Sequence, residues 1–310
     1  MILAVIDCGT NTFNLLIVEL KNYAYTKIFN TRIPVKLGEG TINKGLIDTI
    51  PFNRGINALT EFKKHLIQFN VAKTLAYATS AIRDAKNGTD FVIKTKLDLG
   101  IDITVIDGNR EAELIYLGNR VAANINENLV LIMDIGGGST EFILANGQQI
   151  FWKQSFLLGA ARLLERFTIS DPITKTEIKI IYDYLFNELQ PLFIAIKLFP
   201  TVELIGSSGA FDSIIEMIHG EYNGEPLIKE KICYDVDISN YNKVASLVIK
   251  SNLQQRKEIK GLIPMRFDMI VVSSLLINFI LKSLPINKLR VSTYSLKEGA
   301  LVDFIKNNNS

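Results

Sequence analysis

Residues 131–141 read LIMDIGGGSTE. An apolar strand reaches Asp134, three glycines follow, and Ser139, Thr140 and Glu141 lead into a second apolar strand. Such a turn carries few Cβ atoms, so its N–H groups can come close to an anion and surround it. A carboxylate, a bare backbone loop and a second carboxylate at the end of a strand therefore indicate a phosphate-binding hairpin.

A second hairpin of the same design lies near the N-terminus, where residues 4–13 read AVIDCGTNTF. Both hairpins have an apolar strand, Asp-x-Gly, a hydroxyl residue and another apolar strand. Asp7 and Asp134 are separated by 134 − 7 = 127 residues, about the length of one domain. An isolated Asp-x-Gly hairpin is usually only a turn. The repeated pair predicts a duplicated α/β unit whose two halves face each other across a cleft.

Strands and helices alternate after each hairpin, which predicts an α/β fold. Strands are expected at 2–7, 13–20, 24–35, 73–80, 101–107, 130–136, 140–146, 148–156, 201–206 and 289–295. Helices are expected at 51–70, 109–123, 174–199, 210–220, 268–282 and 296–306. Thr174 and Glu177 have the spacing of a capping box at the start of one of these helices.

The composition restricts the function classes. Of 310 residues, 48% are apolar and the net charge is only +2, so we expect no nucleic-acid partner and no membrane-surface binding. Two cysteines and two histidines exclude a disulfide framework and a thiolate or histidine-rich metal site. The N-terminus lacks a basic leader, and the longest uncharged run, 269–281, is too short to span a bilayer. We expect a soluble, cytoplasmic protein.

The two aspartates suggest a divalent cation. A carboxylate beside a phosphate cradle repels the phosphate unless a cation lies between them. Mg²⁺ fits this position, because it is bound by one or two carboxylates together with waters and phosphate oxygens, and Mn²⁺ would also suit. We expect Asp7 and Asp134 to bind the ion, and Glu141 to act as an outer ligand or to position a water.

Two further segments carry candidate residues. In GNREAELIYLG (108–118), Glu111 lies in a first helical turn, where the helix dipole favours a carboxylate. A solvated first-turn acid is the simpler interpretation. Glu113 lies close by in the same segment, and the local sequence does not distinguish the two glutamates. Arg83, with Ser80 after a strand, could clamp a phosphate or form a surface ion pair.

Two other segments carry weaker signals. The loop 206–209, between a strand and a helix, is a second candidate anion site, with Gly206 and Ser207 contributing backbone. Residues 254–260, QQRKEIK, are interpreted as a solvated charged face.

Together the segments resemble the exopolyphosphatase and guanosine pentaphosphate phosphohydrolase family, which belongs to the superfamily of actin, sugar kinases and heat-shock chaperone ATPases. The resemblance extends from residue 4 to about 300. It rests on motifs in the family's order: DCGTNTFNLLI (7–17), ATSAIRDAKN (78–87), GNREAELIYLG (108–118), DIGGGSTEF (134–142) and LLGAARLLE (157–165).

The resemblance implies a fold of two ribonuclease-H-like domains of the actin-like ATPase type, with mixed sheets flanked by helices. The first domain would comprise 1–122 completed by 296–310, and the second 123–295. It also makes a homodimer one expected assembly, whereas the residues alone leave the oligomeric state open. The chain resembles the short form of the family, because it ends before the additional helical domain of the long form.

The resemblance also assigns roles. Glu111, and not Glu113, falls on the catalytic glutamate that acts as base for the attacking water. Asp7, Asp134 and Glu141 fall on positions tied to Mg²⁺ and water. Arg83 falls on a phosphate-contacting arginine. With the loop residues argued above, the full set expected to bind phosphate is Gly9, Thr10, Asn11, Ser80, Arg83, Gly136, Gly137, Gly138, Ser139, Gly206 and Ser207.

The sequence departs from the family's pattern at several positions. Ser208 adds a Cβ where bare backbone is usual, and serine replaces an expected glycine near 273. Ser295 and Lys297 stand where glycine and arginine are common. These changes concern the second domain and the end of the chain more than the catalytic centre.

Three function classes remain in competition. We expect a Mg²⁺-dependent phosphohydrolase that removes the terminal phosphate from polyphosphate or guanosine pentaphosphate. The alternative is a low-turnover sensor that binds an alarmone or nucleotide in the same fold, which the departures favour and Glu111 opposes. A kinase shares the two-hairpin plan but is disfavoured by the GNREAEL segment.

Overall fold

The computed structural model describes residues 1–21, 24–223 and 231–308. The chain forms two compact units: Met1–Gly118 with Leu296–Ser310, and Asn119–Ser295. This boundary lies within helix α4 (Gly108–Ala122), whereas the expected boundary followed residue 122.

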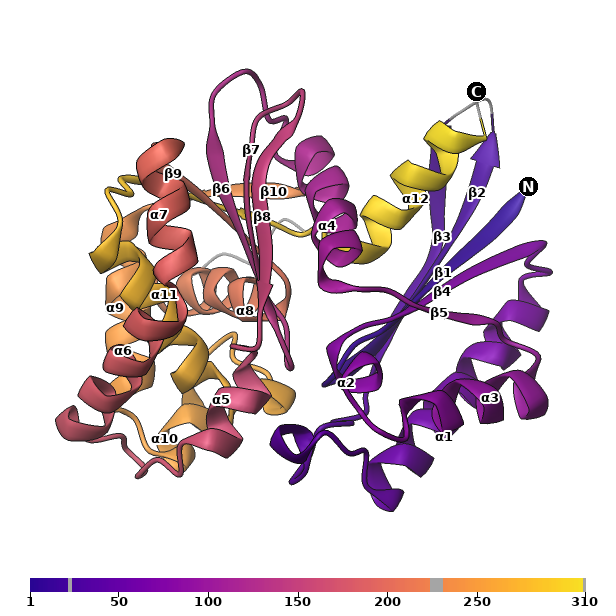
Figure 1. Ribbon diagram of the computed structural model, residues 1–310, viewed down its shortest axis with the longest axis horizontal. Coiled ribbons are helices and arrows are strands. Elements are labelled where there is room, and N and C mark those ends of the chain that lie inside the picture. The colour runs from indigo at the N-terminus through magenta and orange to yellow at the C-terminus, as the bar shows by residue number, and fades with distance from the viewer. Residues whose placement is uncertain (22–23, 224–230, 309–310) are drawn as a thin grey trace. The chain divides into compact units, whose positions relative to one another are not determined.

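The first unit is a five-stranded mixed sheet with helices on it (Figure 1). Strand order is β3-β2-β1-β4-β5, in which β1 to β3 are antiparallel and β1, β4 and β5 are parallel. Its elements are β1 (Ile2–Cys8), β2 (Thr12–Lys21), β3 (Ala24–Pro34), the short 3-10 helix Ile42–Lys44, α1 (Thr49–Gln68), β4 (Lys73–Ala78), α2 (Ser80–Arg83), α3 (Gly88–Leu99), β5 (Ile103–Val105), most of α4, and α12 (Leu296–Asn307).

The second unit repeats this order with one strand added at the edge: β10-β11-β9-β6-β7-β8. Its elements are β6 (Val130–Ile135), β7 (Thr140–Ala145), β8 (Ile150–Phe156), α5 (Ala160–Arg166), α6 (Lys175–Glu188), α7 (Gln190–Leu198), β9 (Glu203–Ser207), α8 (Gly209–Ile218), the π-helix His219–Asn223, β10 (Cys233–Val236), α9 (Ile238–Lys250), α10 (Leu253–Glu258), the 3-10 helix Pro264–Arg266, α11 (Ile270–Ser283) and β11 (Lys288–Ser292). Strands β6 to β9 pair as β1 to β4 do, which supports the predicted duplication.

The alternation of side chains along each central strand directs one set toward the helix-packed core and the other set to the opposite face. In β6, Leu131 and Met133 belong to the hydrophobic core, and Asp134 projects to the other face. In β1, Ile6 and Cys8 enter the core that α1 and α3 cover, and Asp7 lies opposite. Both predicted metal-binding aspartates thus occupy the same kind of position in their own unit.

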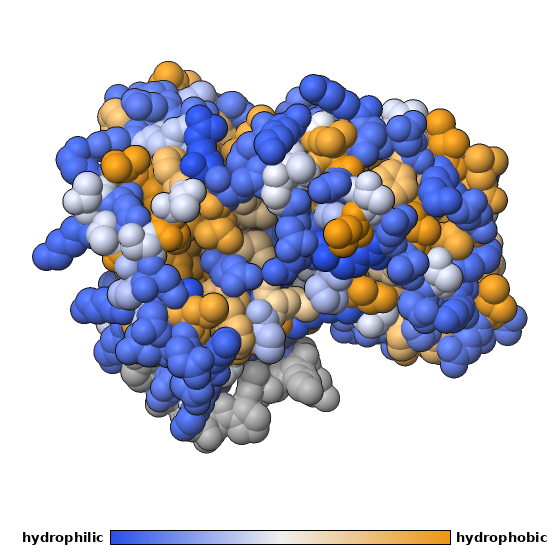
Figure 2. Space-filling model, turned by 90° about the horizontal axis from the view of Figure 1, so that it is seen from below, coloured by the Kyte–Doolittle hydropathy of each residue, from blue (hydrophilic) through white to orange (hydrophobic). Residues whose placement is uncertain are grey.

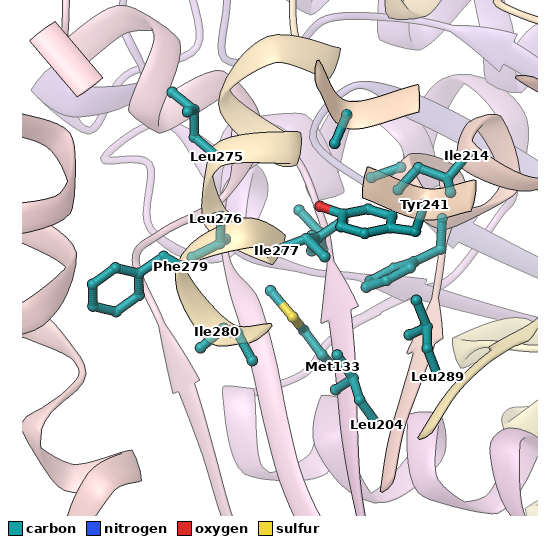
Figure 3. Close-up of a cluster of buried hydrophobic side chains, with 14 of the residues drawn as sticks. Met133, Leu204, Ile214, Tyr241, Leu275, Leu276, Ile277, Phe279, Ile280 and Leu289 are labelled. Atoms are coloured by element: carbon teal, nitrogen blue, oxygen red, sulfur yellow. The ribbon is translucent and has the colours of Figure 1, made fainter. Parts of the chain in front are cut away.

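Apolar side chains of the central strands of the second unit pack against helices α9 and α11. Figure 3 shows Met133 and Leu204 from the strands in one cluster with Ile277 and Ile280 of α11 and with Tyr241 of α9. The Tyr241 hydroxyl donates a hydrogen bond to Asn278 Oδ1 at 2.7 Å, which satisfies its polar group inside the apolar cluster.

Two expectations about this unit were wrong, and one strand was missed. The predicted helix 174–199 is two helices, because Pro191 at the start of α7 cannot continue the preceding hydrogen-bond ladder. Strand β10 was not predicted. Arg256, expected on a solvated face, is only 6% exposed and donates from Nη1 to Asp171 at 2.7 Å. The capping box of Thr174 and Glu177 is confirmed.

The surface seen in Figure 2 is mainly hydrophilic, with apolar side chains in interspersed patches, as is usual for folded proteins. None of the helices in the described part of the chain has the length and apolar character needed to cross a membrane.

Candidate active site

A polar row crosses the sheet of the second unit. The strand register places Ser207 and Glu141 on either side of Asp134, and Ser155 beyond Glu141. Residues paired on neighbouring strands point to the same face of a sheet. The structure therefore brings Ser207, Asp134 and Glu141, three of the predicted site residues, onto one face.

The carboxylate of Asp134 is 4% exposed and accepts hydrogen bonds from three serines. Ser207 and Ser295 donate to Oδ2 at 2.5 and 2.6 Å, and Ser208 lies 2.8 Å from both carboxylate oxygens. A buried charge is tolerated when it is hydrogen-bonded in this way. Ser208 and Ser295 were not among the predicted site residues. Their signal in the sequence was that serine replaces glycine at positions of the family's motifs.

Glu141 is the more deeply buried acid of the row, with 1% exposure. Its Oε1 accepts a hydrogen bond from Ser155 Oγ at 2.7 Å. Ser155 was not predicted either, and only the register of β7 and β8 reveals it.

The glycine loop 136–138 turns its carbonyl groups toward helix α5. Its oxygens accept hydrogen bonds at 2.9 Å from the backbone amides of Ala160 and Ala161 and from Nε of Arg162. In a trans peptide the N–H points opposite to the C=O. The amides of residues 137–139 are therefore directed away from α5, as an anion-binding loop requires.

The segment LLGAARLLE explains how the loop is held. A Cβ on Gly159 would lie 2.4 Å from backbone atoms of Gly137 and Gly138, so only glycine allows α5 to begin this close. Thr140 Oγ1 donates to the carbonyl oxygen of Leu158 at 3.0 Å. Residues 157–165 thus support the glycine loop from behind.

The hairpin of the first unit has the same close turn. A Cβ on Gly9 would meet the carbonyl oxygen of Thr12 at 2.9 Å, and a Cβ on Gly136 would meet that of Ser139 at 3.0 Å. In the first hairpin the carbonyl oxygens of residues 10 and 11 accept hydrogen bonds from the amides of residues 37 and 35, at 2.7 and 2.8 Å. In both hairpins, carbonyl groups are engaged by the chain that follows.

Asn14 is a site residue that the sequence interpretation missed. Its Nδ2 donates to Asp7 Oδ2 at 3.0 Å, and it pairs with Asp7 in the register of β1 and β2. Glu141 holds the same register position beside Asp134. The signal was present in the sequence, because Asn14 follows Asp7, and Glu141 follows Asp134, by seven residues.

Glu111 lies in the first turn of α4 and is 6% exposed. Its Oε2 accepts a hydrogen bond from Arg83 Nη1 at 2.7 Å. Arg83 also donates to the carbonyl oxygen of Ile106 and to Asp84 Oδ1, both at 3.2 Å. The structure thus joins Arg83 directly to Glu111, an arrangement that neither residue's motif predicted.

The remaining candidates of the first unit take supporting positions. Ser80 is 1% exposed and donates through its hydroxyl to Asp84 at 2.8 Å, which connects it to the Arg83 network. Glu113 is half-buried and pairs with Arg110 at 3.1 Å. The two glutamates, which the local sequence could not distinguish, therefore differ in burial and in the arginine with which they pair.

The loop 206–209 is packed more tightly than an open anion site would be. A Cβ on Gly206 would lie 2.2 Å from the ring of Phe211, so Gly206 makes room for the core. A Cβ on Gly209 would lie 1.6 Å from Arg266 Nη2. This contact places a guanidinium group at the start of α8, beside the predicted loop.

The predicted metal ligands are distributed over both units, with Asp7 in the first and Asp134 and Glu141 in the second. Among the residues that the structure describes, no group of three or more His, Cys, Asp or Glu is arranged to hold a metal ion. The groups around Asp134 are carboxylate and hydroxyl oxygens. This donor set suits a hard cation such as Mg²⁺, which needs only one or two carboxylates besides water and phosphate.

Residues 16–308 match the model of the Ppx/GppA phosphatase family. The chain belongs to this family. It is 25% identical over 305 residues to exopolyphosphatase 1 of Mycobacterium tuberculosis, covering 97% of this chain and 88% of that protein. It is 24% identical over 304 residues to guanosine-5'-triphosphate,3'-diphosphate pyrophosphatase of Pseudoalteromonas atlantica, covering 98% of this chain and 58% of that protein.

Solved structures of the Ppx/GppA family confirm the fold. An exopolyphosphatase from Cytophaga hutchinsonii superposes with a TM-score of 0.96 at 37% identity, covering 99% of this chain and 98% of that one. The Aquifex aeolicus family member gives a TM-score of 0.82 at 26% identity, covering 100% and 99%. The predicted fold class, two α/β domains of the actin-like type with mixed sheets flanked by helices, is confirmed.

Proposed function

We propose that this protein removes the terminal phosphate from polyphosphate or guanosine pentaphosphate, with Glu111 as the base for the attacking water. The Ppx/GppA family and its exopolyphosphatase and pyrophosphatase relatives make the chain a hydrolase of phosphoanhydride bonds. The observation that carries the residue assignment is the buried Glu111 carboxylate, held at 2.7 Å by Arg83 at the start of a helix.

Glu111 fits the task of a base in several respects. Its carboxylate is fixed by the helix that bears it and by Arg83, so it can orient a water reproducibly. Phosphoryl transfer depends mainly on positioning and charge stabilisation, and a positioned general base contributes a factor of about 10²–10⁴. Arg83 supplies a positive charge close to this carboxylate, where an entering phosphate would also be attracted.

The hairpin loops provide the phosphate-binding elements. In the second unit the amides of residues 137–139 point away from α5 and can donate to phosphate oxygens without losing a hydrogen bond to that helix. Gly9, Thr10 and Asn11 form the corresponding loop of the first unit. Backbone amides of this kind bind the equatorial oxygens of a phosphoryl group and do not need to reorganise as charge shifts.

Asp134 and Glu141 are the residues of the second unit that would hold Mg²⁺, and Asp7 is the corresponding carboxylate of the first unit. When bound, the ion would offset the negative charge of the phosphate chain. The serine hydroxyls on Asp134 and Ser155 on Glu141 keep these carboxylates oriented. Mn²⁺ has similar ligand preferences and is expected to substitute.

The experiment is a measurement of phosphate release from long polyphosphate, tripolyphosphate and guanosine pentaphosphate, with Mg²⁺ and with a chelator. Native protein should release phosphate only with the metal, and Glu111→Gln should lose about 10²–10⁴-fold of the rate. Glu113→Gln is the matched control, because it changes a neighbouring carboxylate that pairs with Arg110. Full activity in Glu111→Gln would mean that another residue acts as the base. An absence of release from every substrate would favour the sensor alternative.

A further inference from the structure

The hydroxyl groups around Asp134 come from three separate places in the chain. Ser207 ends strand β9, Ser208 precedes helix α8, and Ser295 follows strand β11. All three lie in the second unit. Ser208 and Ser295 also approach each other, with 3.1 Å between their Oγ atoms. Together the serines connect two loops to a carboxylate on the central strand.

The two oxygens of Asp134 are used unequally. A carboxylate has about four lone-pair positions, two on each oxygen. Oδ2 accepts from Ser207 at 2.5 Å and from Ser295 at 2.6 Å, which fills both positions on that atom. The Ser208 hydroxyl is shared between the oxygens, at 2.8 Å from each. Among the described residues Oδ1 has no other donor, so its remaining acceptor capacity is available to a ligand.

Ser208 holds this position at a conformational cost. Its backbone has φ 70° and ψ 176°, a region that L-residues with a side chain rarely adopt. Glycine would take this conformation without strain. A serine in such a conformation persists only when its surroundings over-determine it. The hydrogen bonds from its hydroxyl to Asp134 and the contact with Ser295 are the interactions that do so.

We propose that Ser208 and Ser295 are positioning residues that hold Asp134 so that Oδ1 alone is presented to the cation. This inference rests on the proposed function, in which Asp134 binds Mg²⁺. Ser295 saturates Oδ2 together with Ser207, and Ser208, which contacts both oxygens, fixes the carboxylate plane. Asp134 is thereby prevented from binding a cation through both oxygens. They act through Asp134, and they occupy two positions at which the sequence departs from the family's pattern.

The first measurement is the affinity for Mn²⁺ alone, determined from the electron paramagnetic resonance signal of the free ion. The variants are Ser208→Ala, Ser208→Gly and Ser295→Ala, with Ser295→Thr to restore a hydroxyl. We expect the dissociation constant to rise about tenfold in the first three, as when a hydrogen-bond partner of a metal ligand is removed. Ser295→Thr should remain within a few-fold of the native value. Ser213→Ala is the matched control, because this buried serine donates to the Gly209 carbonyl oxygen and not to Asp134.

The second measurement separates positioning from stability. Ser208→Ala and Ser208→Gly both lack the hydroxyl, but only the glycine relieves the strained backbone. Thermal unfolding should therefore give a higher midpoint for Ser208→Gly than for Ser208→Ala, while the two have equal Mn²⁺ affinities. The Mg²⁺ concentration for half-maximal phosphate release should follow the Mn²⁺ affinities.

The outcomes are distinct. Unchanged Mn²⁺ affinity in the three hydroxyl-free variants would overturn the inference and leave the proposed function intact. If the Mn²⁺ affinities instead followed the unfolding midpoints, Ser208→Gly would bind Mn²⁺ as the native protein does. That result would show that the Ser208 hydroxyl has only a structural role. If the native protein bound no Mn²⁺, this inference would be overturned together with the proposed metal dependence. Phosphate release in the absence of metal would then still support the proposed hydrolase activity.

Discussion

Arg83 Nη1 lies 2.7 Å from Glu111 Oε2, and the two side chains are only 17% and 9% exposed. Arg83 belongs to the short helix α2 and Glu111 to the first turn of α4, so the ion pair ties two motifs that are 28 residues apart. The motifs alone suggested separate roles, one on phosphate and one on water. The contact indicates that Arg83 also orients Glu111, the proposed base.

The first prediction concerns the coupling of these two residues. Because Arg83 positions Glu111, Arg83→Gln should reduce kcat about 10²-fold, the effect expected of a small misplacement of a reacting group. If the arginine acts mainly through the glutamate, the double variant with Glu111→Gln should have nearly the kcat of Glu111→Gln alone. A kinetic double-mutant cycle on phosphate release measures this.

Arg110→Gln is the control for that cycle, because it removes the ion pairs of Arg110 to Glu113 on the same helix and to Asp303. Partly solvated ion pairs of this type contribute little, so its kcat should stay close to the native value. Multiplicative losses in the Arg83 and Glu111 double variant would instead mean that Arg83 acts on the phosphate independently of the base.

The second prediction concerns the glycine loop. Gly159→Ala places a Cβ 2.4 Å from the backbone of Gly137 and Gly138, so either α5 or the loop must move. We expect a loss of about 1–3 kcal/mol in the free energy of unfolding, as in other overpacked sites. The KM for the phosphate substrate should rise more than kcat falls, because under the proposed function the loop would bind phosphate in the ground state as well as in the transition state.

Urea unfolding and steady-state kinetics check this prediction. Leu157→Ala is the control, since Leu157 is 54% exposed in the same segment. A Gly159→Ala variant with native stability and native KM would mean that the loop is not held by α5.

The fold was predictable where local patterns carried the information. Apolar runs with period two, turns rich in glycine and the repeated Asp-x-Gly motif sufficed for the paired hairpins. Their common order in the two sheets follows from the same repeat. The confirmed capping box at Thr174 is another local signal, because its residues are three positions apart.

The features that were missed depend on contacts distant in sequence. Strand β10 has four residues and is identified as a strand by pairing with β11, more than fifty residues later. Ser295 meets Asp134 across 161 residues, and only the folded chain reveals that contact. Arg256 was misjudged for a related reason: its neighbours in sequence are charged, but its partner Asp171 is 85 residues away.

The third prediction concerns Arg256. Its guanidinium donates to Asp171 at 2.7 Å, to the Ser251 carbonyl oxygen at 2.6 Å and to the Phe267 carbonyl oxygen at 2.9 Å. Removal of one partner from a buried pair is costly, although Asp171 is 42% exposed and partly solvated. Arg256→Ala should therefore lower the free energy of unfolding by about 2–3 kcal/mol.

Chemical denaturation checks this value, with Lys257→Ala as the control at an exposed neighbouring position. The control should lie within about 0.5 kcal/mol of the native protein. Equal stability of the two variants would support the original interpretation of residues 254–260 as a solvated face.

The fourth prediction is a pH dependence that arises from the capping box of α6. Hydrogen bonds from the hydroxyl and amide of Thr174, with further ones from Ser170, lower the pKa of Glu177 from 4.5 to about 2. The pKa is depressed in the folded state, so the folded protein binds the proton less readily than the unfolded chain does. The carboxylate therefore stabilises the fold fully above about pH 4.5, and this contribution is lost as the pH falls toward 2.

Glu177→Gln removes the titrating group and retains a side chain that can accept a hydrogen bond. Between roughly pH 5 and pH 3, the urea midpoint of the native protein should fall more steeply than that of the variant, because in this window the unfolded native chain takes up a proton at Glu177 that the folded protein does not bind. Asp183→Asn, which removes an exposed ion pair to Lys179 on the same helix, should preserve the native slope. If Glu177→Gln and the native protein had parallel midpoints over this range, the cap would contribute nothing to acid stability, and the pH response would have to come from other carboxylates.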